Sequence, residues 1–137
     1  MAAIVSVRLQ IAQGGSYADK ALLIVEYAIE PTLHDVQNDQ AYSERVQVYT
    51  EGHRVGLPGL EHPIPGALSE GTVVFTSDQQ VQRDFQVLVP LAVLEQGVVS
   101  PLQPDAIRAR VTLTPFFLQT VMHDSNTVDL NKPFVNA

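Results

Sequence analysis

The sequence predicts an all-β protein, a single antiparallel β-sandwich of about seven strands. Apolar and polar residues alternate with a period of two along several stretches, which is typical of strands with one buried and one solvated face. The connections between these stretches are mostly short, and no stretch of ten residues has the periodicity of an amphipathic helix. We therefore expect less than about 10% helix. A partly open barrel is the alternative architecture.

The alternation is most prominent from Val81 to Val93, and we expect this stretch to organise the fold. From Leu88 onward both of its faces turn apolar, which predicts a strand that is covered on both sides. Pro90 cannot donate a hydrogen bond to a neighbouring strand, so pairing must end, bulge or reach a sheet edge there. We expect the strand to end at Val89 and a helical turn to follow over residues 91–96.

The remaining strands are expected on both sides of this stretch. Four half-buried strands are predicted from their alternation, over residues 3–12, 20–30, 42–50 and 106–114. In the first of them, the residues expected to share the buried face are Val5, Val7, Leu9 and Ile11. A short strand over 72–76 should form a hairpin with the organising stretch. Residues 116–122 are expected to form a last strand, or to continue the one before it across a bulge at Pro115.

Individual positions carry further expectations. We expect four side chains from two of these strands in the core: Phe85, Val87, Val111 and Leu113. Thr32 is a suitable cap for one helical turn with Asp35 in its first turn. Glu44 interrupts an apolar stripe, which suggests that its end of the strand lies outside the core.

Two segments are expected to lack regular structure. Residues 52–70 hold four of the eight glycines and three of the nine prolines, and together these exclude a regular element. The same segment carries five aliphatic residues, namely Val55, Leu57, Leu60, Ile64 and Leu68, so we expect a long loop that packs on its own domain or on a partner. Residues 124–137 are polar and are expected to form a surface tail.

Length and composition limit the class of protein. The 137 residues fit one domain over 1–137, and the net charge of -7 disfavours nucleic acid and anionic membranes as partners. Cysteine is absent, which excludes disulfides and thiolate chemistry. The first residues show no signal peptide, and no apolar run reaches the ~20 residues of a membrane helix. A cytoplasmic location is the default expectation.

The candidate chemistry is sparse, and no cofactor is predicted. His53, Glu61 and His62 are three candidate metal ligands within the expected loop, whereas a closed zinc site needs four, and loop histidines are usually solvated. Arg108 and Arg110 share the polar face of a strand and are candidates for binding an acidic ligand, although cross-strand charge partners are the commoner role. Neither a nucleophile elbow nor a phosphate-binding loop occurs in the sequence.

The sequence thus favours a non-enzymatic β-sandwich that acts through protein–protein contacts, as a structural or assembly subunit. Leu57, Leu60 and Ile64 are the expected interface residues, because exposed aliphatic side chains in such number would form a patch that monomers seldom tolerate. We expect self-association or binding of another protein. The alternative is a small-molecule-binding, carbohydrate-binding or hydrolytic module with its site beneath residues 52–70.

Overall fold

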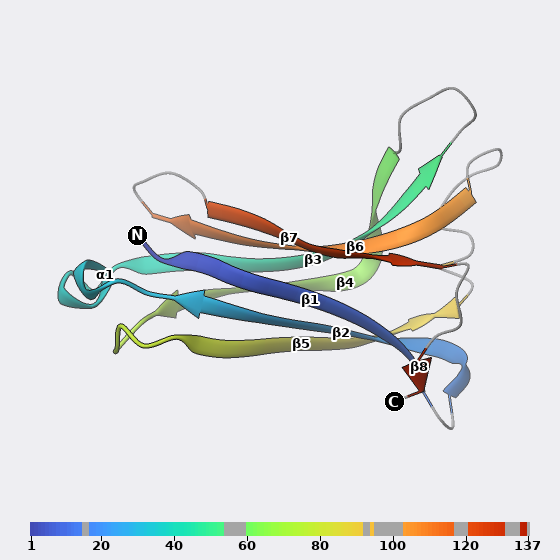
Figure 1. The fold of residues 1–137 in the computed structure, drawn as a ribbon, viewed down its shortest axis with the longest axis horizontal. Coiled ribbons are helices and arrows are strands. Elements are labelled where there is room, and N and C mark those ends of the chain that lie inside the picture. Colours follow the sequence, from blue (N-terminus) through green and yellow to red (C-terminus); the bar gives the residue numbers. More distant parts are fainter. Residues whose placement is uncertain are drawn as a thin grey trace.

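A computed structural model describes residues 1–14, 17–53, 60–91, 94, 103–116, 121–130 and 135–136. Strands make up 77% of the structure and helix 7%, as the sequence predicts. The elements, drawn in Figure 1, are β1 Ala3–Gly14, β2 Tyr17–Glu30, α1 Leu33–Gln37, β3 Ala41–His53, β4 Leu60–Val74, β5 Val81–Pro90, β6 Gln103–Pro115, β7 Val121–Asp129 and β8 Val135–Asn136. No helix in this part of the chain has the length and apolar character needed to cross a bilayer.

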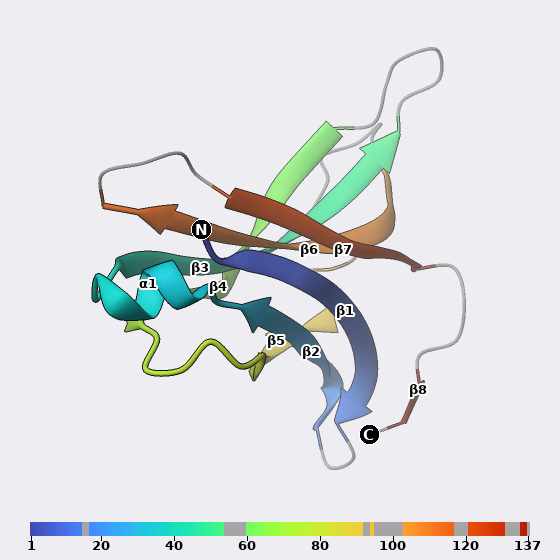
Figure 2. The ribbon, with the colours of Figure 1, turned by 60° about the vertical axis from the view of Figure 1, so that its left-hand side comes forward.

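The strands form two sheets that pack face to face. Sheet A has the order β5-β2-β1-β8, and sheet B has the order β4-β3-β6-β7. Pairing is antiparallel throughout, except between β1 and the two-residue β8. Strand β1 of sheet A lies beside β7 of sheet B (Figures 1 and 2), but the sheets do not close into a barrel. The predicted β-sandwich is therefore confirmed, and the barrel alternative is not.

The core lies between the inner faces of the two sheets. Alternate residues of β2 and β6 contribute to it, among them Leu23, Val25, Ile107, Val111 and Leu113, all with 0% exposure. These strands sit inside their sheets, so their alternating side chains are covered by both neighbouring strands and the opposite sheet. The central positions of the core are thus the ones that the period-two pattern predicts most directly.

Strand β5 is an edge strand of sheet A, which changes two expectations. Its residues alternate between the two faces as predicted, but Phe85 and Val87 are only half-buried because no strand of the described chain covers their outer side. Leu88 is 39% exposed, so the strand is not covered on both faces. β5 runs to Pro90, and the helical turn expected over 91–96 falls mostly outside the described residues.

The first strand contains a bulge that reverses the facing of its start. Ile4 pairs with Ile29 and Ser6 with Ala28, so Val5 is an extra residue in β1. Val5 is 40% exposed and Ile4 is buried in its place, contrary to the expected facing. Beyond the bulge, Leu9 and Ile11 are buried as predicted.

The expectation of a long loop over 52–70 is wrong for the residues of this segment that the structure describes. β3 continues to His53 and β4 begins at Leu60, so residues 60–70 belong to a strand. β4 is the edge strand of sheet B, where proline is tolerated because an N–H that faces away from the sheet needs no partner. Pro63 and Pro65 therefore do not exclude a strand here. Residues 54–59 lie outside the described residues.

A wide bulge in β4 accounts for the glycine in this strand. Tyr49 pairs with Pro63 and Gln47 with Leu68, so four residues, 64–67, stand opposite Val48 alone. Gly66 has a φ of +82°, which suits glycine. The buried Gln47 amide donates to the backbone oxygens of Val48 at 2.8 Å, Ala67 at 3.1 Å and Ile64 at 3.4 Å, and so satisfies carbonyls that the bulge removes from the ladder.

Two other expected connections differ in the structure. Residues 72–74 end β4 in sheet B, whereas β5 belongs to sheet A, so the expected hairpin between them is wrong. The chain instead crosses between the sheets after Phe75, whose burial anchors the crossing to the core. The polar tail expected over 124–137 is also wrong in part, because 124–129 complete β7 and 135–136 form β8.

The short helix α1 is built around the expected cap. Thr32 Oγ1 accepts from the Asp35 N–H at 3.1 Å, and Asp35 Oδ2 accepts from the Thr32 N–H at 2.9 Å, which forms a capping box. The buried Tyr42 hydroxyl donates to Asp35 Oδ1 at 2.5 Å and accepts from the Ala2 N–H at 3.0 Å. Tyr42 thereby ties α1 and the start of β1 to the core.

Candidate functional site

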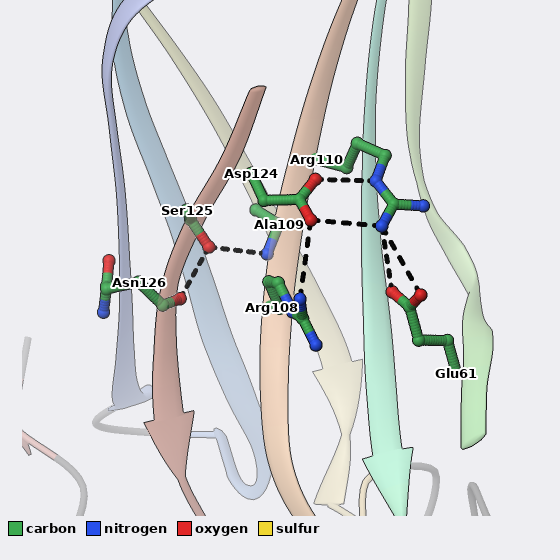
Figure 3. A network of polar contacts seen from close by, with 7 residues as sticks. All are labelled: Glu61, Arg108, Ala109, Arg110, Asp124, Ser125 and Asn126. Carbon is green, nitrogen blue, oxygen red and sulfur yellow. Dashed lines mark hydrogen bonds and ion pairs between the residues drawn. The ribbon is translucent and has the colours of Figure 1, made fainter. Parts of the chain in front are cut away.

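The two candidate arginines lie in a row of charges on the outer face of sheet B (Figure 3). Arg110 on β6 binds Asp124 on β7 in a bidentate way, with Nε to Oδ1 at 2.6 Å and Nη2 to Oδ2 at 3.1 Å. The same Nη2 lies 3.1 Å from Glu61 Oε2 on β4. Arg108 Nη1 lies 3.5 Å from Asp124 Oδ2. The Arg110 guanidinium also stacks over the Tyr49 ring of β3, 5.0 Å from its centre.

The charges of this row are balanced by one another. Hydrogen bonds from Arg110 hold the pKa of the Asp124 carboxyl below its usual value, although partial burial acts in the opposite direction. The same contact raises the pKa of Arg110. Two guanidinium groups thus face the carboxylates of Asp124 and Glu61, and an acidic ligand would have to compete with both. The arrangement supports cross-strand pairing rather than an anion site.

Next to this row, a bulge in β7 connects the two sheets. Arg108 pairs with Thr127 and Arg110 with Asp124, so Ser125 and Asn126 together oppose Ala109. The Ser125 hydroxyl accepts from the Ala109 N–H at 2.7 Å, in place of the lost ladder bond (Figure 3). Asn126 Oδ1 accepts from the Leu9 N–H of β1 at 2.9 Å. The bulge therefore binds one edge of sheet A, and nothing in the local sequence predicts it.

A second ionic cluster lies between the sheets, where Glu44 is buried and Arg83 is partly exposed. Glu44 on β3 of sheet B accepts from Arg83 Nε on β5 of sheet A at 2.6 Å, and from Arg83 Nη2. The Tyr27 hydroxyl on β2 donates to Glu44 Oε2 at 2.7 Å. Burial, followed by the Glu44 contact, raises the pKa of Tyr27. The expectation that Glu44 lies outside the core is wrong, because Arg83 neutralises its charge inside the sandwich.

The candidate metal ligands are only partly placed. Glu61 is engaged by Arg110, and its neighbour His62 follows it on β4, where successive side chains point to opposite faces. The side chain of His53 lies outside the described residues, so the three-residue site stays a prediction. Within the described part of the chain, no three His, Asp or Glu residues gather closely enough to hold a metal ion.

The candidate interface residues of the expected loop differ in where the structure places them. Ile64 is 2% exposed and belongs to the core, where the β4 bulge places it, so it is not available to a partner. Leu60 begins β4, but its side chain lies outside the described residues, as does all of Leu57. Leu68 is 40% exposed on β4. The expected aliphatic patch is therefore smaller than its sequence suggests.

A hollow of about 710 Å³ lies on sheet A, away from residues 60–70. Its lining includes Arg8, Gln10, Glu26, Gln82 and Asn126. The first four of these side chains are exposed on the outer face of the sheet. The lining includes a single aromatic residue, Tyr27, and that side chain is buried and bound to Glu44. Small-molecule sites usually combine apolar walls with a few polar groups, which this lining does not provide.

Several exposed apolar residues lie at the end of the sandwich where β3 begins, near Tyr42. Ala2 donates to the Tyr42 hydroxyl, Val73 and Pro115 pair with Tyr42 on its two sides, and Thr32 joins it through Asp35. Ala2, Val73, Pro115 and Thr32 are each next in the chain to a large exposed apolar residue. These four residues, with their exposed fractions, are Met1 at 41%, Val74 at 47%, Phe116 at 53% and Leu33 at 57%. We call these four residues the apolar end. Figure 1 draws the N-terminus, α1 and the last residues of β6 together at this end.

Comparison with known proteins assigns no family to this chain. No protein-family model matches it, and neither a curated protein nor a solved structure is detectably similar to it.

Proposed function

We propose that this chain is a non-enzymatic assembly subunit that contacts other protein chains, copies of itself included, through the apolar end. The observation that carries this proposal is the grouping of Met1, Leu33, Val74 and Phe116 around one buried tyrosine. In water, four large apolar side chains left about half exposed incur a hydration cost that contact with an apolar partner removes.

The polar parts of the molecule support the same proposal. The arginines that sequence patterns offer as ligand-binding groups are engaged by carboxylates, and the buried Glu44 is engaged by Arg83. The outer row joins strands of sheet B, and the Glu44–Arg83 pair joins sheet B to sheet A, so these arginines serve the fold. A standard interface buries about 800 Å² on each partner, with an apolar centre and a polar rim. The apolar end has the composition of such a centre.

The test is the mass of the protein in solution as its concentration rises, measured by sedimentation velocity. We expect species larger than the 15.0 kDa monomer, and we expect the double variant L33S/F116S to lose part of that association. L68S is the matched control, because Leu68 is 40% exposed but lies six residues before Val74 on β4, about 20 Å away. If L33S/F116S associates as the intact chain does, the apolar end is not the contact surface.

A further inference from the structure

The four outer edges of the two sheets are protected to different degrees against pairing with a further strand. β4 carries Pro63, Pro65 and a bulge, β7 carries a bulge, and the edge of β1 is bound by Asn126 and β8. β5 has none of these devices between Val81 and Val89, and it pairs with β2 through ten consecutive residues without a register shift. Figure 1 draws it along the lower margin of sheet A. No strand of the described chain pairs with its other side. Such a regular open edge is a template for another strand.

The register fixes which backbone groups of β5 face outward. Both the N–H and the C=O of Leu9 bind Asn126, so they point away from β2. Leu9 pairs with Val25, whose N–H and C=O must therefore point toward β5, where its partner is Phe85. The backbone N–H and C=O of Phe85 are therefore hydrogen-bonded to β2. By alternation, the groups that face the open edge are those of Gln82, Asp84, Gln86 and Leu88.

We infer that β5 pairs in an antiparallel way with β5 of a second copy of this chain, about a two-fold axis at Phe85. Phe85 then lies opposite its own counterpart, Asp84 opposite Gln86, and Gln82 opposite Leu88. All four outward residues are paired, and four pairs that each exchange two hydrogen bonds give about eight between the copies. The two four-stranded sheets become one continuous sheet of eight strands. This contact uses a different surface from the apolar end and does not depend on it.

Charge and proline select this register over its neighbours. A shift of the axis to residue 84 places two Asp84 carboxylates opposite each other, which is unfavourable. A shift to residue 86 places Gln82 opposite Pro90, which has no N–H to donate. At Phe85 no like charges meet, and two half-buried phenyl rings cover each other on the inner face. The strand is thus complementary to itself, which favours a second copy as its partner.

Charge variants at Gln86 test the contact and its register. In the dimer, Q86D places a carboxylate opposite Asp84 twice and should raise the dissociation constant about two- to thirty-fold. Q86K places an ammonium opposite Asp84 and should lower it, and D84K/Q86D should restore the affinity that Q86D loses. Gln86 is exposed, so none of these changes touches the core. Q10D, an equal change at an exposed position of β1, is the control and should leave the dissociation constant unchanged.

A single cysteine tests the position of the axis, because the chain has none of its own. Cα atoms of facing residues that are not hydrogen-bonded to each other lie about 4.5 Å apart, within disulfide range. F85C should therefore form a covalent dimer on mild oxidation. L88C should not, since the two copies of residue 88 would lie about 20 Å apart. If F85C does not fold, the Gln86 variants still test the contact and its register.

Three results would overturn the inference. The first is an intact chain that stays monomeric at high micromolar concentration. The second is an oligomer whose dissociation constant responds alike to Q86D, Q86K and Q10D. The third is equal cross-linking of folded F85C and L88C. If L33S/F116S loses association and Q86D does not, the contact lies at the apolar end instead.

Discussion

Removing one partner of the Glu44–Arg83 pair, which joins the two sheets, should destabilise the fold strongly. Replacing Glu44 by alanine removes the acceptor of the Tyr27 hydroxyl and of two Arg83 nitrogen atoms. Breaking a fully buried ion pair costs about 3–5 kcal/mol because the remaining charge is left desolvated. The Arg83 side chain is 38% exposed and can regain some hydration, so we expect E44A to lower the free energy of unfolding by about 2–4 kcal/mol.

Urea unfolding followed by circular dichroism measures this change, with the slope m checked for constancy. The chain offers a matched control in Arg45 and Glu70, a surface pair at 3.3 Å whose side chains are 49% and 59% exposed. E70A should cost less than about 1 kcal/mol. E44A/R83A should cost less than the sum of its single changes, because removing both partners leaves no uncompensated charge. A loss for E44A no larger than that for E70A would refute the assignment of Glu44 to a buried pair.

Four further substitutions test the packing, the β4 bulge and the outer charge row. Leu113→Ala should cost about 2–5 kcal/mol, and Phe85→Ala less than about 2 kcal/mol since its ring is half-exposed; equal losses in urea titration would contradict their placement. Gln47→Ala leaves bulge carbonyls unsatisfied and should cost about 1–3 kcal/mol, with faster hydrogen exchange along β4. The lowered pKa of Asp124 stabilises the fold above the unfolded value of about 3.9 and loses this effect as pH falls through the folded value. D124N should therefore flatten the decline of thermal stability below about pH 4, and an unchanged profile would contradict the pairing with Arg110.

The sequence predicted those strands whose burial repeats along the chain. Residues 3–12 and 106–114 alternate because one face of each is covered along most of its length, so local pattern and tertiary environment agree. The capping box at Thr32 and Asp35 was predictable for the same reason, since all its atoms belong to four consecutive residues.

The errors arise where a residue's role depends on a distant partner. Pro63 and Pro65 exclude a central strand, but they are compatible with an edge strand, and only the order of sheet B reveals that β4 is at the edge. Glu44 within an apolar stripe was a signal of a buried partner, and Arg83 among the apolar odd positions of β5 was its counterpart. Asn126 and Gln47 gave no such signal, because each satisfies backbone groups that a bulge alone creates.

The two proposed contact surfaces have different consequences when they are combined. A contact about a two-fold axis uses the same patch on both copies, so β5 alone can produce a dimer and nothing larger. The apolar end lies on other residues and stays open in that dimer. If copies also meet there, each chain has two independent contacts, and association continues beyond the dimer. Q86D should then weaken the β5 contact and favour pairs joined at the apolar end, L33S/F116S should favour pairs joined at β5, and the triple variant should associate more weakly than either. A triple variant that associates as strongly as the intact chain would require a contact that neither surface provides.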